Sequence, residues 1–259
     1  MKKRRLNQLM DLLRQRRELE STEAAAFLGV SLTTIRRDFE ELANLGMAHR
    51  FHGGLSALEN TRSPVLPISM RRSLDTRLKE RLALLAAREL PDSGAIFIDG
   101  GTTTACLAAC LTNPRLHVIT NSVALLRKMG DMPSPRARLT MSGGDFHQIT
   151  DNLLGPEALR TLSHYHADIA VISCTSLDAE HLYDDPEEAA AVQRCMMENA
   201  DRLMVIADSG KLGRRALYKS IPLEKVQVLV TDFVEEKREI YAAIRQKGVR
   251  LLLDTPRRG

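Results

Sequence analysis

Apolar residues near the N-terminus of this chain recur every three or four positions, which is the spacing of one face of an α-helix. Within residues 4–17 the apolar stripe consists of Leu6, Leu9, Met10 and Leu13. A second, shorter helix is predicted to end at Leu28, with either Ser21 or Thr22 as its N-cap. Gly29 then marks a tight turn.

A third helix is predicted for residues 31–45, with Ser31 as its N-cap and Gly46 as its C-terminal stop. Its apolar face carries Ile35, Phe39, Leu42 and Leu45. Its other face opens with Thr33, Thr34, Arg36 and Arg37. This arrangement predicts a helix-turn-helix, whose second helix presents hydroxyl and guanidinium groups to bases and phosphates in the DNA major groove. An ordinary amphipathic helix with a solvated charged face would give the same pattern.

Residues 48–52 are predicted to form a strand that ends at a Gly53-Gly54 turn. This hairpin would be a wing that places Arg50 and His52 beside the DNA backbone or the minor groove. The histidines of the strand could instead be surface residues without a ligand.

A linker is predicted for residues 58–73, which contain two prolines and no clear periodicity. It would separate a DNA-binding domain of residues 1–57 from a second domain of residues 74–259. An amphipathic helix over residues 75–90 would open the second domain.

Seven short apolar runs follow, separated by helical segments. Runs of this length, rich in valine and isoleucine, indicate a mainly parallel sheet covered on both faces, as in a Rossmann-like α/β domain. The runs are residues 95–98, 117–120, 139–142, 169–173, 203–207, 226–230 and 249–253.

Positive charge is concentrated toward the N-terminus. The chain of 259 residues has a net charge of +4, yet residues 1–17 alone hold seven basic residues and one acidic residue. From residue 82 onward the balance is 21 basic to 23 acidic residues. This asymmetry indicates a polyanionic partner for the N-terminal part. No apolar run reaches the length of a membrane span, so we expect a cytoplasmic protein.

The four cysteines form no CxxC pair and lie in apolar surroundings, which predicts buried thiols and no metal site. They are Cys106, Cys110, Cys174 and Cys195. The Walker motif and the GxGxxG fingerprint are both missing, so no cofactor is predicted.

Polar residues gather where the predicted strands end, and ligands of such folds lie beyond the carboxyl ends of parallel strands. The first strand runs into a turn followed by a helix, whose hydroxyl and amide groups suit an anion, although a purely structural helix cap is the alternative. The predicted ligand-binding residues are Asp99, Gly100, Gly101, Thr102, Thr103, Thr104, Asn121, Ser122, Gly143, Gly144 and Lys211. Lys211 would hold a phosphate as a point charge, unless it is a solvated lysine beside a turn. Glu187 and Glu188 are interpreted as partners of a helix dipole.

Two sets of motifs resemble those of the DeoR family of bacterial transcriptional regulators. The run VSxxTIRRDxxxLxxxG followed by RFHGG is similar to the family's N-terminal domain. FIDGGTTT, VITNS, SGG, LLGPEAL, ADSGKLG and LVTD are similar to its effector domain. Gly210 and the stretch from Cys174 to His181 depart from the family pattern. The resemblance implies an operator-reading helix and a structural Asp38.

By resemblance, the second domain is similar in fold to sugar-phosphate isomerases and binds a phosphorylated sugar that alters operator affinity. The expected protein is a repressor of a sugar-catabolic operon, a homodimer or homotetramer on two-fold operator DNA. The alternatives are a sugar-phosphate isomerase with a DNA-binding domain and a DNA-binding protein whose second domain only oligomerises. Asp99, Asp168, Glu187 and Glu188 are the carboxylates available to an enzyme, but no catalytic residue is predicted.

Overall fold

The computed structural model describes residues 2–44, 48–57, 71, 75–132 and 136–255. The chain divides into two compact units, Met1–Leu74 and Asp75–Gly259. The predicted linker lies almost entirely outside the described residues, as do Leu45 and Gly46. Among the described residues, no helix is long and apolar enough to cross a membrane.

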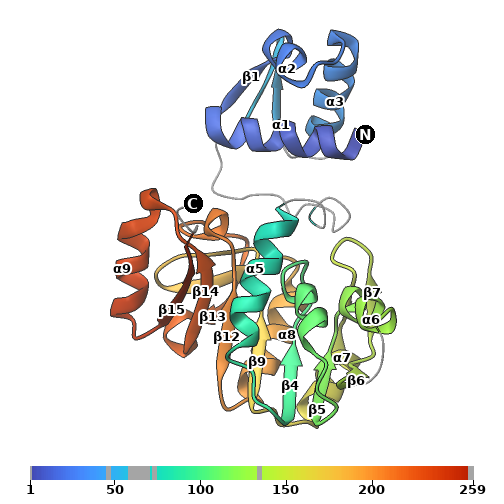
Figure 1. The fold of residues 1–259 in the computed structure, drawn as a ribbon, viewed down its shortest axis with the longest axis vertical. Helices are drawn as coiled ribbons and strands as arrows, with labels where there is room; N and C mark the ends of the chain where they lie inside the picture. The colour runs from blue at the N-terminus through green and yellow to red at the C-terminus, as the bar shows by residue number, and fades with distance from the viewer. Residues whose placement is uncertain (1, 45–47, 58–70, 72–74, 133–135, 256–259) are drawn as a thin grey trace. The chain divides into compact units, whose positions relative to one another are not determined.

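The N-terminal unit is a three-helix domain with a small antiparallel sheet of order β1-β3-β2 (Figure 1). Its elements are α1 (Lys2–Arg16), β1 (Glu18–Glu20), α2 (Ser21–Leu28), α3 (Leu32–Asn44), β2 (His49–Phe51) and β3 (Gly54–Ser56). The three predicted helices and the wing are confirmed. Their apolar stripes meet in one core that includes Leu9, Leu13, Ile35 and Phe39.

The predicted N-cap of the second helix is wrong. Helix α2 begins at Ser21 itself, and Glu20 occupies the N-cap position without a side-chain capping bond. The reason is that Glu20 is paired with Gly54 in the sheet, so that β1 runs directly into the helix. The Ser21 N–H group donates to the Gly53 carbonyl at 2.9 Å, which ties the wing turn to this helix start.

An ion pair joins helix α1 to helix α3. The Arg5 guanidinium donates through two nitrogens to the carboxylate of Asp38, with Nη2 3.1 Å from Oδ1. The Asp38 side chain is 2% exposed and that of Arg5 is 18% exposed. Asp38 is therefore structural, and its carboxylate holds the first helix against the third.

The second unit is built on a seven-stranded parallel sheet of order β15-β14-β12-β9-β4-β5-β6. All seven predicted runs are confirmed as its strands: β4 (Gly94–Ile98), β5 (Leu116–Thr120), β6 (Arg138–Met141), β9 (Ile169–Ile172), β12 (Leu203–Ile206), β14 (Val228–Asp232) and β15 (Arg250–Asp254). Successive strand residues enter two separate cores, because side chains alternate between the faces of a sheet.

Helices cover both faces, as the uninterrupted apolar strands require. One core contains residues from α5 (Thr76–Ala87), η1 (Thr104–Cys110) and α6 (Val123–Gly130). The other contains residues from α7 (Pro156–Ser163), α8 (Glu187–Glu198) and α9 (Arg238–Gln246) (Figure 1). Three further 3-10 turns are η2 (Ser209–Lys211), η3 (Leu223–Lys225) and η4 (Glu235–Lys237).

Two smaller sheets were not predicted. One is the hairpin of β7 (Asp145–His147) and β8 (Asn152–Leu154). The other is the antiparallel sheet of β10 (Ser176–Leu177), β11 (His181–Asp184) and β13 (Tyr218–Pro222). The stretch from Cys174 to His181 that departs from the family pattern supplies β10 and the turn into β11.

We predict that Asp38→Ala lowers the free energy of unfolding of the N-terminal unit by about 3 kcal/mol, because it removes one partner of a buried ion pair. Hydrogen exchange of peptides within residues 1–57 measures the change. All four tyrosines lie in the second unit, at positions 165, 183, 218 and 241. Tyrosine fluorescence should therefore report an unchanged unfolding transition for that unit. Wild-type exchange in α1 and α3 would contradict a supporting role for the pair.

Candidate DNA interface and ligand site

Polar residues at the start of α3 point to solvent. Thr33, Arg36 and Arg37 are exposed, whereas Ile35 and Asp38 on the same helix are buried. Ser31 precedes the helix, and its Oγ accepts from the Thr34 N–H group at 3.3 Å, as predicted for an N-cap. The Thr34 hydroxyl lies 2.9 Å from the same Oγ, so these two residues hold the exposed turn in shape.

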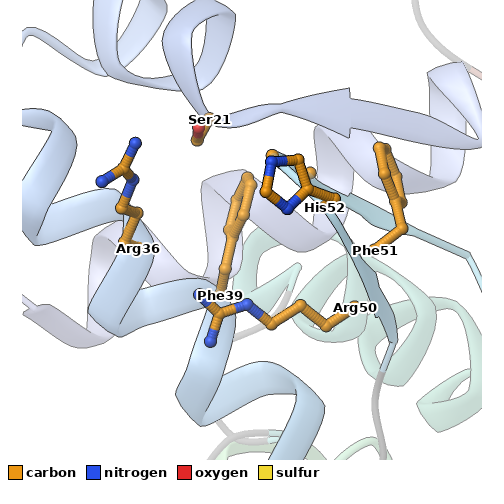
Figure 2. A pocket seen from close by; sticks show the side chains of 8 residues that line it. Ser21, Arg36, Phe39, Arg50, Phe51 and His52 are labelled. Carbon is orange, nitrogen blue, oxygen red and sulfur yellow. The ribbon is translucent and has the colours of Figure 1, made fainter.

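The start of α3 and the wing surround one concavity of about 320 Å³. Figure 2 shows Arg36 on α3, with Arg50 and His52 from the wing, arranged about Phe39. These three predicted DNA-binding residues are all exposed. Guanidinium groups from two elements therefore face a space that a backbone phosphate can enter.

Five further residues line this concavity and were not predicted at the DNA interface: Ser21, Phe39, Phe51, Gly53 and Gly54. A Cβ at position 54 would lie 2.1 Å from the Phe51 ring, so glycine there lets the ring fold over the wing. The two turn glycines were the sequence signal that pointed to this part of the wing. The pairing of β1 with β3 could not be predicted, because each strand has only three residues.

The second candidate site lies between β4 and β9, where the order in which strands are added to the sheet reverses. From β4 the chain adds β5 and β6 on one side, and then returns to place β9 on the other side. Ligands of open parallel sheets bind beyond the carboxyl ends of the strands at such a switch point. Asp99 follows β4 and Ser173 follows β9, and the Asp99 N–H group donates to the Val171 carbonyl at 2.9 Å.

The loop after β4 is tightly packed by its neighbours. A Cβ on Gly100 would lie 1.9 Å from Asn152 Oδ1, and one on Gly101 would lie 3.2 Å from Ser173 Cβ. The Thr104 hydroxyl donates to the carbonyls of Asp99 and Gly101 at 2.8 and 3.2 Å, so it closes the loop. The Thr103 side chain is buried, and that of Thr102 is half-buried.

The neighbouring strand ends approach the same loop. Asn121 Oδ1 accepts from the Gly100 N–H group at 2.9 Å. Ser122 caps α6 through its Oγ, which accepts from the Leu125 N–H group at 3.1 Å. Gly143 and Gly144 have φ angles of +66° and +102°, and both are exposed after β6.

Lys211 points back into this region from the 3-10 turn after β12. Its Nζ donates to Ser173 Oγ at 3.1 Å and to the Cys174 carbonyl at 2.6 Å. The structure thus brings Lys211 to the end of β9, at the switch point. Gly210 lies in the same turn, where its N–H group donates to Asp208 Oδ1 at 3.1 Å.

Two buried carboxyl groups beneath the loop share one amide. Gln193 Nε2 lies 3.1 Å from Asp99 Oδ2, 2.5 Å from Asp184 Oδ2 and 2.8 Å from the Ser173 carbonyl. Ser220 Oγ donates to Gln193 Oε1 at 2.6 Å, which fixes the amide orientation. The two amide protons cannot serve three acceptors fully.

Protonation of one of the two carboxyl groups relieves this shortage of hydrogen-bond donors. Burial, reinforced by the charge of Asp184, raises the pKa of Asp99 to about 7. Burial also raises the pKa of Asp184, although the Thr175 hydroxyl bond opposes the shift. A buried carboxyl group whose pKa is raised by burial and by a neighbouring carboxylate is found at functional sites more often than in ordinary cores.

Sequence profiles match both units. That of the DeoR C-terminal sensor domain covers residues 75–233, and that of the DeoR-like helix-turn-helix domain covers residues 5–61. The chain belongs to the DeoR family.

Two curated relatives match most of this DeoR-family chain. The HTH-type transcriptional repressor CsqR of Escherichia coli is 30% identical over 233 residues, which cover 88% of this chain and 87% of that protein. The glycerol-3-phosphate regulon repressor of Escherichia coli is 28% identical over 230 residues, covering 88% and 90%. Ribose 5-phosphate isomerase A of Methanocaldococcus jannaschii is 17% identical, with a TM-score of 0.38 over 53% of this chain and 55% of that one. Similarity at that structural level says nothing about activity.

The other polar candidates of this DeoR-family protein are Asp168, Glu187 and Glu188. Asp168 accepts from the Ala95 N–H group at 2.8 Å, at the amino end of the sheet. Glu187 and Glu188 are exposed in the first turn of α8, where they suit its dipole.

The expectation of buried thiols is correct for Cys174 alone. Cys106, Cys110 and Cys195 are half-buried, because each lies on a helix that only partly faces the core. Within the described ranges, no group of three or more histidine, cysteine, aspartate or glutamate side chains could hold a metal ion.

The Asp99 carboxyl predicts a specific pH dependence. Its pKa is 3.8 ordinarily and about 7 when folded, so folding takes up a proton and stability falls as pH rises between these values. Asn copies the protonated carboxyl. We therefore expect Asp99→Asn to flatten this fall by up to about 1.4 kcal/mol per pH unit between pH 5 and 7. Urea unfolding followed by tyrosine fluorescence measures both proteins, and parallel curves would contradict the assignment.

Proposed function

We propose that this DeoR-family protein represses a sugar-catabolic operon and is released from its operator by a phosphorylated sugar. The proposal follows the named functions of the relatives, which are transcriptional repressors. The observation that carries it is the convergence of Lys211, Asn121 and the Gly100 loop at the switch point of the sheet. Donors and one cation there suit an anionic, hydroxyl-rich ligand.

The DNA-binding half of the proposal rests on the N-terminal unit. Arg36, Arg37, Arg50 and His52 would contact phosphates, while Thr33, Thr34 and one arginine would read bases. The basic residues near the N-terminus would add salt-dependent affinity. We propose a dimer or tetramer in the cytoplasm, because operators of two-fold symmetry match two-fold proteins.

An enzymatic role is not part of the proposal. Asp168, one of the carboxylates available to an isomerase, bonds at the amino end of the sheet, away from Asp99 at the carboxyl end. A base and an acid must reach the same substrate. Turnover of ribose or hexose phosphates by the purified protein would overturn this view.

Fluorescence anisotropy on the DNA upstream of the gene tests the proposal directly. Titration with a panel of phosphorylated sugars should release the protein with one of them, and the corresponding free sugar should have no effect. Specific DNA binding that no sugar phosphate alters would reject the sensor half and favour an oligomerising second unit.

We predict that Arg37→Ala weakens operator binding by about 1–3 kcal/mol, because an exposed guanidinium on α3 is lost. The slope of log affinity against log salt concentration should fall by about one. Arg88→Ala, an exposed arginine of the other unit, is the matched control. Anisotropy at several salt concentrations measures both variants. Wild-type affinity for Arg37→Ala would remove this residue from the interface.

We also predict that Lys211→Ala keeps operator affinity but no longer responds to the sugar phosphate. The change removes the ammonium group that lies at the end of β9. Lys211→Met keeps the aliphatic stem and should behave alike, and Lys219→Ala on exposed β13 should respond as wild type. Normal release of Lys211→Met would place this lysine outside the site.

A further inference from the structure

Strand β15 lies at one edge of the large sheet, beside β14 (Figure 1). Its N–H group at Arg250 and its carbonyl at Asp254 bond to backbone groups at the two ends of β14, each at 3.0 Å. Backbone groups of successive residues alternate between the two sides of a strand. The N–H and C=O groups of Leu251 and Leu253 therefore point away from β14. No strand of the described chain pairs with that side of β15.

The sequence of β15 does not protect this edge. An unpaired strand edge is a template for another strand, and proteins commonly block it with proline, lysine or a bulge. The strand reads Arg-Leu-Leu-Leu-Asp, without proline or lysine, and its register with β14 is uninterrupted. Its two charges have opposite signs and stand at opposite ends. Such a strand is complementary to a second copy of itself in the antiparallel direction. The other edge strand, β6, reads Arg-Leu-Thr-Met and lacks this property.

One register pairs every backbone group on the open side of β15. It is an antiparallel arrangement of two copies about a two-fold axis at Leu252. Leu251 of one copy then lies opposite Leu253 of the second, and each N–H group donates to the facing carbonyl. Arg250 lies opposite Asp254 of the second copy, which is a favourable cross-strand pair and occurs twice. This reciprocity is what a two-fold interface requires.

Ion pairs within each copy hold the two charges of β15 in place. Arg250 pairs with Glu89, just after α5, and Arg81 of α5 donates through Nε to Asp254 Oδ2 at 2.8 Å. The Arg250 side chain is 52% exposed and that of Asp254 is 18% exposed. Pairing between copies extends each of these bonds, so that acidic and basic groups alternate from Glu89 of one copy to Arg81 of the second. Side chains that are ordered before association lose less conformational freedom on binding.

An exposed leucine beside this edge is a second observation. The two ion pairs join α5 to opposite ends of β15, so the helix and the strand run antiparallel and Leu84 lies between the pairs. Leu84 shares a face of α5 with Arg81, because residues three apart lie on one side of a helix. It is 59% exposed. In two copies joined at β15, both α5 helices lie on the same face of the common sheet, with Leu84 near the two-fold axis.

We propose that β15 joins two copies of this chain edge to edge, so that one sheet runs through both and Leu84 of each copy covers the joint. The inference rests on the proposed homo-oligomer and assigns a surface to it. All of its contacts come from the second unit, so the joint forms without operator DNA or sugar phosphate.

Charge reversal at the ends of β15 tests the register, with the mass of the full-length protein in sedimentation as the readout. Arg250→Asp leaves only carboxylates in the cross-strand pairs, and Asp254→Arg leaves only guanidinium groups. We expect each variant alone to have half the wild-type mass. An equal mixture should recover the wild-type mass, because mixed copies bring opposite charges together. Tyrosine fluorescence confirms that the second unit of each variant is folded. Wild-type mass of the single variants, or a mixture that does not associate, overturns the proposal.

Arg138→Asp is the matched control, since Arg138 is exposed on the opposite edge strand. This variant should keep the wild-type mass. A halved mass for Arg138→Asp, with none for Arg250→Asp, would transfer the joint to β6. A monomeric wild-type protein would overturn the joint together with the proposed oligomer, whereas normal assembly of Arg250→Asp would overturn the joint alone.

Leu84→Asp tests the flank of the joint without changing the strand. It should weaken association at least tenfold, because it brings two carboxylates together near the two-fold axis. Leu126→Asp, at a leucine of α6 that is 40% exposed, should associate as wild type does. Equal association of these two variants would exclude α5 from the joint.

Hydrogen exchange resolved by residue locates the joint on the backbone. The N–H groups of Leu251 and Leu253 should exchange at least tenfold faster in Arg250→Asp than in the wild-type protein, because they lose the facing carbonyls. The N–H group of Leu252 points to β14 and should change less, so it reports whether the strand itself stays paired. Unchanged exchange at Leu251 and Leu253 overturns the proposal.

Discussion

The buried carboxyl groups of Asp99 and Asp184 depend on one side-chain amide. Gln193 reaches both of them, and Ser220 holds its orientation from the small antiparallel sheet. The same amide binds the Ser173 carbonyl, and the Ser173 hydroxyl receives Lys211. The ends of β4 and β9, the helix α8 and the small sheet are therefore positioned as one hydrogen-bonded assembly. A group of this kind gives a ligand site fixed geometry before any ligand arrives.

The N-terminal unit uses the same principle with a single pair. Arg5 and Asp38 place a charged bond inside an otherwise apolar core, where misplacing either group would be costly. The threonines and arginines at the start of α3 then project from a helix whose buried face is held by this ion pair and by the apolar core. In both units, the residues proposed to meet a ligand are carried by elements anchored through buried polar contacts.

Much of this architecture could be predicted from sequence, for reasons that are local. The inner strands of the large sheet are buried on both faces, so each is a short run of aliphatic residues bounded by turns. The pairs β7–β8 and β10–β11 have two to four residues per strand, too few to show alternation. The start of α2 was misassigned because a strand pairs with Gly54, a contact between distant residues.

The ligand site was predictable as far as its residues follow strands. Asn121 stands directly after one apolar run and Lys211 stands four residues after another; the first bonds to the Gly100 loop and the second to the end of β9. Gln193 gave no signal, because its partners are up to 94 positions away in the sequence.

The close packing of Asn152 on Gly100 constrains how this protein can change over time. A β-carbon at position 100 would lie 1.9 Å from the Asn152 amide oxygen, so a larger residue there requires the Asn152 side chain to move or to be replaced by a smaller one. The effects of substitutions at the two positions are therefore coupled. Drift toward a new ligand has more room after β6, where a β-carbon on Gly143 would meet no atom of the described chain within 4 Å. The φ of +66° at that position directs such drift toward asparagine or aspartate, which tolerate a left-handed backbone better than other side chains do.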